Sequence, residues 1–231
     1  MAQDKVQYPV ITHKGMVGMS KSLICAHAGA ENSRDNSLES IAMLLDCGAD
    51  LVEVDLWGPR GGDLVLCHDR PGPGEEHPLF FEALGLLAKV QGPRLNVDVK
   101  EPGAIFPAWN MACEEGHGGR VIFTGDVSWQ EAQEAQEALK ARLPLWINHY
   151  LLPCNKRRQA HQAAFELGFA MLNISWRSLN ERMLSEAPER LSVWTVNEEA
   201  RLGDLLARGV GSITTQAPIM ALKLRRELQG G

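Results

Sequence analysis

The feature that most constrains the fold is an alternation of short β-branched runs with segments of helical character along nearly the whole chain. Eight such runs predict strands, at 22–28, 50–56, 95–100, 120–124, 145–148, 169–175, 191–197 and 211–215. Helical patterns lie between them, at 36–47, 130–142, 157–167 and 198–208. Eight βα units in 231 residues predict a single-domain (β/α)8 TIM-type barrel over residues 1–231, with its core between about residues 20 and 220.

A doubly wound sheet is the alternative α/β architecture, but no glycine-rich phosphate loop follows the first predicted strand. An additional strand is predicted at 63–68, joined to its predecessor by the turn-rich segment 58–62. The C-terminal sequence KLRRELQGG (223–231) is expected to form a frayed last helix and a tail.

Charge and cysteine usage limit the classes of partner. The formal net charge of −6 argues against binding of nucleic acid, because no basic stripe is present to neutralise phosphates. No signal peptide is visible at the N-terminus, and no apolar stretch reaches the length of a membrane span, so we expect no stable membrane insertion. The cysteines are odd in number and lack zinc-ligand spacing, which indicates reduced thiols of a cytoplasmic protein: Cys25, Cys47, Cys67, Cys113 and Cys154.

Glu53 and Asp55 stand two residues apart on a predicted strand, so both side chains point to the same face. Two like charges inside a barrel repel each other unless a cation lies between them. Oxygen ligands favour a hard divalent ion such as Mg²⁺ or Ca²⁺. The alternative is a carboxylate pair at the barrel rim that is bound by an arginine or a lysine.

Asp98 and Lys100 repeat this spacing on a later strand, on the same face as Asn96. Asp98 could complete a metal site, and Lys100 could contact a phosphate oxygen. The alternative is a salt bridge between the two.

Two histidines stand at predicted strand ends near these carboxylates, which suggests a general acid and a general base: His27 and His68. Trp194 is a candidate wall of the substrate pocket or a filler of the barrel interior. Asn36 is a candidate helix cap or a hydrogen-bond donor to the substrate. Weaker candidates at the rim are Asp126 and Asn173 or Ser175.

These residues occur in an ordered set of motifs: AHAG (26–29), DNSLESI (35–41), EVD (53–55), CHD (67–69), NVDVK (96–100), VWTVN (193–197) and GVGSITTQAP (209–218). The set resembles the glycerophosphodiester phosphodiesterase family across essentially the whole chain. The resemblance implies a TIM barrel with one divalent cation on Glu53, Asp55 and Asp98. It also implies a small-molecule phosphodiester substrate, cleaved with His27 and His68 as acid and base.

Four departures from the family pattern bear on the substrate. The arginine that follows the first histidine in the family is Ala28, which leaves phosphate binding to Lys100 or to the metal. The third acidic ligand is Asp98 instead of glutamate, and the late Thr-Asp becomes Thr-Gln at Gln216. Only residues 70–94 separate His-Asp from the next strand, so the family's insertion is shortened and a more open site is expected.

The sequence leaves two alternative functions open. The Asp-x-Lys form and the absent arginine resemble the sphingomyelinase D-like phospholipases, although those proteins are secreted and disulfide-bonded. A barrel that binds a phosphorylated ligand without cleaving it is the second alternative, motivated by Ala28 and the shortened insertion.

Overall fold

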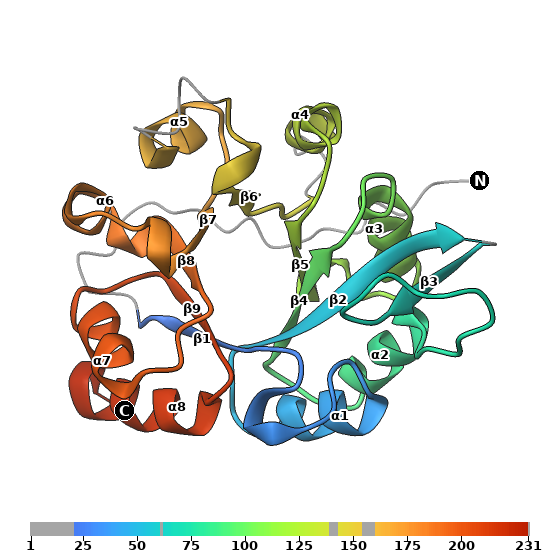
Figure 1. Cartoon of the computed structure of the whole chain (residues 1–231), viewed down its shortest axis with the longest axis horizontal. Helices are drawn as coiled ribbons and strands as arrows, with labels where there is room; N and C mark the ends of the chain where they lie inside the picture. The colour runs from blue at the N-terminus through green and yellow to red at the C-terminus, as the bar shows by residue number, and fades with distance from the viewer. Residues whose placement is uncertain (1–20, 61, 139–142, 154–159, 231) are drawn as a thin grey trace, which may run out of the picture.

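The computed structural model describes residues 21–60, 62–138, 143–153 and 160–230, and within them eight parallel strands form a barrel with helices outside (Figure 1). The order around the sheet is β5-β4-β2-β1-β9-β8-β7-β6. The strands are β1 Leu23–Ala26, β2 Leu51–Arg60, β4 Arg94–Val99, β5 Val121–Gly125, β6 Ile147–Asn148, β7 Leu172–Ser175, β8 Leu191–Trp194 and β9 Ser212–Thr215. The predicted (β/α)8 barrel is therefore confirmed.

The ring closes between its two ends, β5 and β6, through a single parallel bridge from Phe123 to Leu145. Phe123 N donates to Pro144 O and Trp146 N donates to Phe123 O, each at 2.9 Å. Leu145 thus takes part in the sheet as predicted, although the regular part of β6 is shorter than the predicted strand. The additional strand also forms, as β3 Asp63–Leu66, and pairs antiparallel with β2.

Helices cover the outside of the barrel between the strands (Figure 1). They are α1 Leu38–Asp46, α2 Phe80–Leu87, α3 Ile105–Glu114, α4 Trp129–Ala138, α5 Ala160–Glu166, α6 Glu181–Glu186, α7 Glu199–Ala207 and α8 Pro218–Gln229. Parts of the predicted helices 130–142 and 157–167 lie outside the described residues, as does Cys154. None of the helices in the described ranges is long and apolar enough to cross a membrane.

The expectation of a frayed C-terminal helix is wrong, because α8 runs to Gln229 and hydrogen bonds hold its last residue. The Gln229 side chain donates to Leu206 O at 2.7 Å and to Ser22 Oγ at 2.9 Å. These hydrogen bonds join the last helix to α7 and to Ser22, just before β1. They therefore link the C-terminal end of the barrel to its N-terminal end.

The strands divide their side chains between an apolar exterior and a layered interior. On β2, Val52 and Val54 are fully buried against the helices, while Glu53 and Asp55 point to the interior. The first interior layer is an apolar plug of Cys25, Leu51, Ile122 and Trp146. The polar residues lie further along the strands, so the plug forms a floor beneath them.

Candidate active site

A cavity of about 260 Å³ lies at the carboxyl ends of the strands, the end where TIM barrels carry their active sites. Its lining includes six of the residues predicted from the sequence: His27, Glu53, His68, Asp98, Lys100 and Trp194. Asp55 lies beneath this lining and is only 1% exposed. The structure therefore brings the predicted carboxylates and both histidines to one place.

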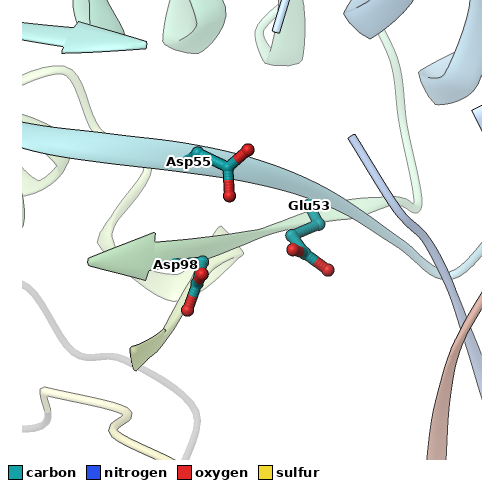
Figure 2. A group of neighbouring side chains, drawn as sticks. All are labelled: Glu53, Asp55 and Asp98. Atoms are coloured by element: carbon teal, nitrogen blue, oxygen red, sulfur yellow. The ribbon is translucent and has the colours of Figure 1, made fainter. Parts of the chain in front are cut away.

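Three carboxylates form the centre of the site (Figure 2). Glu53 and Asp55 come from β2 and Asp98 from the neighbouring β4, where it pairs in register with Asp55. One oxygen from each lies within 4.8 Å of the other two. Oxygen donors at this spacing can share one hard cation.

Lys100 binds two of these carboxylates from the end of β4. Its Nζ lies 2.7 Å from Asp55 Oδ1 and 2.5 Å from Asp98 Oδ2. Burial lowers the pKa of Lys100, but the carboxylates of Asp98 and Asp55 outweigh burial and hold the pKa above its ordinary value. The salt bridge that was the alternative for Asp98 and Lys100 is present, and it includes Asp55 as well.

Among the described residues, Glu53 has no lysine or arginine within salt-bridge distance. Burial, and then the charges of Asp98 and Asp55, raise its pKa well above the ordinary value, and Lys100 only partly offsets them. Burial also raises the pKa of Asp98, despite its contact with Lys100. Three ionised carboxylates against one ammonium leave two negative charges uncompensated, which a divalent cation would balance.

Asn36 lies behind Asp55 and outside the cavity lining. Its Nδ2 donates to Asp55 Oδ2 at 2.7 Å, and its Oδ1 accepts from Asp55 N at 2.8 Å. The N-cap of α1 is Ser37, whose side chain accepts from Ser40 N at 3.2 Å. Asn36 is therefore placed to orient a carboxylate of the site, a role that its spacing in the sequence does not reveal.

The two histidines differ in exposure and in their partners. His27 Nδ1 lies 2.5 Å from Ala28 O, and its Nε2 lies 4.0 Å from Glu53 Oε1. His68 Nδ1 lies 3.0 Å from Asp69 Oδ1, and the His68 side chain is 57% exposed at the cavity mouth. Ala28 itself is buried in the core and contributes no charge to the site.

The opposite side of the cavity carries a polar wall that the sequence indicated only in part. Tyr150 Oη donates to Asp126 Oδ1 at 2.5 Å, and Asn148 Nδ2 donates to Tyr150 Oη at 2.5 Å. The sequence indicates Asp126 and Asn173 as residues of the rim, whereas no pattern in it points to Asn148 or Tyr150. Tyr150 lies in a single 3-10 turn after β6, which has no periodicity to mark it.

The fold has close counterparts among solved structures. A glycerophosphodiester phosphodiesterase from Parabacteroides distasonis is 19% identical, with a TM-score of 0.73 over 91% of this chain and 99% of that one. An Oleispira antarctica phosphodiesterase, solved with the product sn-glycerol-3-phosphate, is 16% identical, with a TM-score of 0.69 over 88% and 96%. This chain has the fold of the glycerophosphodiester phosphodiesterases.

A third structure, the glycerophosphodiester phosphodiesterase of Thermotoga maritima, is 16% identical with a TM-score of 0.66, and it covers 89% of this chain and 99% of its own. No family model and no curated protein sequence matches the chain. The likeness is thus one of three-dimensional structure along nearly the full length of each protein.

Proposed function

We propose that the protein is a metal-dependent phosphodiester hydrolase that acts on glycerophosphodiesters. The observation that carries the proposal is the meeting of two histidines, Lys100, Glu53 and Asp98 in the lining of one cavity at the carboxyl end of the barrel, with Asp55 directly beneath it. The named activity of the structural neighbours supports the same reaction class.

Glu53, Asp55 and Asp98 would hold the cation, and their donor set of three carboxylates suits Mg²⁺ or Ca²⁺. The uncompensated charge and the raised pKa of Glu53 support this assignment. When bound, a divalent cation supplies electrostatic stabilisation of the negative charge on the phosphate in the transition state.

His27 is suited to act as the general base. The carbonyl of Ala28 can only accept a hydrogen bond, so Nδ1 carries the proton in the neutral ring. Nε2 is then the basic nitrogen, and it lies 4.0 Å from Glu53 Oε1. It could take a proton from an attacking water or substrate hydroxyl.

His68 is suited to act as the general acid. Asp69 accepts from its Nδ1, which fixes the orientation of the ring and leaves Nε2 to exchange a proton with the leaving alkoxide. Its exposure at the cavity mouth gives it access to solvent, from which it can be reprotonated.

Lys100 is suited to contact the phosphate. Of the three N–H donors of its ammonium, two are directed to Asp55 and Asp98, and the third can donate to a phosphate oxygen. Asn36 would keep Asp55 in place, and Trp194 would form part of the cavity wall.

The histidine assignment is tested by His27→Ala and His68→Ala, with His117→Ala as the matched control near the opposite end of the barrel. We expect each site variant to lose roughly 10²- to 10⁴-fold in kcat while cation binding, measured by calorimetry, is retained. Turnover at the wild-type rate in either site variant would show that the assignment is wrong.

A barrel that binds a phosphorylated ligand without cleaving it is the second candidate, because Ala28 leaves Lys100 as the one permanent cation in the described cavity lining. Incubation with Mg²⁺ or Ca²⁺ and a panel of glycerophosphodiesters and lysophospholipids separates the candidates. Metal-dependent release of glycerol 3-phosphate or of a cyclic phosphate supports an enzyme. Release of the head group from lysophospholipids would indicate sphingomyelinase D-like cleavage, and binding without release would support the second candidate.

The cytoplasmic location of the protein stays a prediction.

A further inference from the structure

The segment that carries His68 stands beyond the regular barrel sheet. β2 pairs with β4 as far as Leu56, which lies opposite Val99, and from Trp57 onward β2 pairs with β3. The two strands form a ribbon that extends past the end of β4 (Figure 1). His68 follows the end of β3 in this ribbon. Its position therefore depends on contacts outside the barrel ladder.

The ring of His68 has little support from its own side-chain contact. The His68 side chain is 57% exposed, and Asp69, which lies beside its Nδ1, is 96% exposed. Asp69 can orient the ring, but a pair so open to water contributes little free energy to a defined position. A ring that gives its proton to one particular oxygen therefore requires a fixed backbone beneath it.

Cys67, the residue before His68, supplies this fixed backbone. It is buried, and its N–H donates to Asp55 O at 3.2 Å. Its carbonyl accepts from Trp57 Nε1 at 3.1 Å, and its thiol donates to Asp69 O at 3.1 Å. The first hydrogen bond ties the segment to the strand of the proposed cation ligands. The indole holds the same residue from its carbonyl side.

The Trp57 side chain is itself held in place. It is half-buried, and Arg70 Cζ lies over its ring, 5.9 Å from the ring centroid. Arg70 Nη2 in turn lies 3.7 Å from Glu101 Oε2, just after β4. The indole N–H is therefore presented to Cys67 in a fixed direction. Trp57 is not part of the cavity lining, so any effect that it has on the reaction passes through its neighbours.

We propose that Trp57 is a positioning residue, whose hydrogen bond to the Cys67 carbonyl places His68 to protonate the leaving group. In that step the attacking oxygen gives its proton to His27 and bonds to phosphorus. The bond from phosphorus to the leaving oxygen breaks, and His68 Nε2 gives that oxygen a proton. The proposal rests on the proposed function and adds to it a residue outside the cavity.

The test compares two glycerophosphodiesters that differ in their need for a proton donor. Glycerol 3-(4-nitrophenyl phosphate) loses 4-nitrophenolate, which leaves without a proton, whereas glycerophosphoethanolamine loses an alkoxide, which needs one. Trp57→Phe removes the N–H donor and keeps an aromatic ring. We expect it to lower kcat roughly 10- to 100-fold for glycerophosphoethanolamine and less than about 3-fold for the nitrophenyl diester.

Trp109→Phe is the matched control, because Trp109 is also half-buried but packs on α3 against Phe123. It should leave the ratio of the two kcat values, glycerophosphoethanolamine over nitrophenyl diester, unchanged. An equal fall of kcat for both diesters in Trp57→Phe would indicate a merely structural role and overturn the proposal. An unchanged ratio in Trp57→Phe would overturn it as well.

A double variant shows whether Trp57 acts through His68. His68→Ala alone should lower the ratio in the same direction, and Trp57→Phe added to it should lower the ratio no further. A further fall in the double variant would overturn the proposal. If Trp57→Phe does not fold, benzothienylalanine at position 57 takes its place with the same expectations, since it has the shape of tryptophan with sulfur instead of the N–H.

Failure of the wild type to cleave glycerophosphoethanolamine with Mg²⁺ or Ca²⁺ present would count against the proposed function instead. NMR relaxation of the folded protein then decides the positioning. The backbone order parameters of Cys67, His68 and Asp69 should fall in Trp57→Phe and stay unchanged in Trp109→Phe. Unchanged order parameters at these three residues in Trp57→Phe would overturn the proposal.

Discussion

Glu53 is buried beside Asp98 and Asp55. The nearby negative charges favour binding of a cation, but without a cation they destabilise the ionised form of Glu53 and hence the fold. Its raised pKa means that the folded protein disfavours the ionised form relative to the unfolded chain. The stability that this group contributes is present below the unfolded carboxyl pKa and is lost as pH rises through the raised folded pKa. A cation bound by Glu53 would offset this loss.

We expect Glu53→Gln to raise the free energy of unfolding of the metal-free protein by about 1 to 2 kcal/mol at pH 8, since the amide removes a buried charge. The gain should be smaller at pH 5, where more of the Glu53 carboxyl is protonated. Urea unfolding with a chelator at both pH values measures it, with the exposed Glu39→Gln as control. A variant less stable than wild type at pH 8 would contradict the account.

Asn36 acts on the site through Asp55. It has a φ of 55°, which asparagine and glycine tolerate, so Asn36→Gly removes the side chain without straining the backbone. We expect the variant to lose about 1 to 3 kcal/mol of unfolding free energy, because Asp55 loses two buried hydrogen bonds. Cation affinity, measured by calorimetry, should also fall. An unchanged affinity in folded Asn36→Gly would show that Asp55 needs no support from Asn36.

At the scale of the element, β5 must approach β4 closely where the site is built. Gly125 ends β5 with a φ of 99°, and a Cβ there would lie 2.2 Å from Val99 O and 2.7 Å from Asp98 Oδ1. Both contacts are far inside van der Waals distance. The glycine therefore keeps the backbone of β4 and the Asp98 carboxylate in position.

Gly125→Ala should destabilise the fold by about 2 kcal/mol or more and also weaken cation binding, since Asp98 must move. Thermal unfolding and a cation titration measure the two effects. Gly119→Ala is the control, because a Cβ at Gly119 meets nothing within 4 Å. Equal melting temperatures for the two variants would contradict the close approach.

The alternation of side chains between the two faces of a strand makes most of the site predictable from the sequence. Side chains at i and i+2 share a face, so the sequence predicts that Glu53 lies with Asp55 and Asp98 with Lys100, as the structure has them. The register between β2 and β4 is a tertiary property, and so is the contact of Lys100 with Asp55. The wall around Tyr150 depends on a short turn, which leaves no pattern in the sequence.

At the scale of the molecule, an apolar floor closes the barrel interior and the charged residues gather at one end. A cation that binds only the folded state should stabilise the whole barrel by mass action. At 100 times its dissociation constant the gain is about 2.7 kcal/mol.

Mg²⁺ or Ca²⁺ should therefore raise the melting temperature at pH 8, and Glu53→Gln should reduce the shift. Because the pKa of Glu53 is raised, protons compete with the cation at higher pH than for an ordinary carboxylate, and the shift should shrink on acidification. Melting curves at several pH values, with and without chelator, measure this. A shift that is independent of pH and of Glu53 would place the cation elsewhere.

We propose above all that this barrel cleaves glycerophosphodiesters with a cation held by Glu53, Asp55 and Asp98. The most direct measurement is the release of glycerol 3-phosphate from glycerophosphoethanolamine by chelator-treated protein, before and after addition of Mg²⁺ or Ca²⁺. We predict release only after the ion is added, and a loss of at least about 100-fold in Asp98→Asn. Release that continues in the presence of chelator, or that survives in Asp98→Asn at the wild-type rate, would contradict the claim.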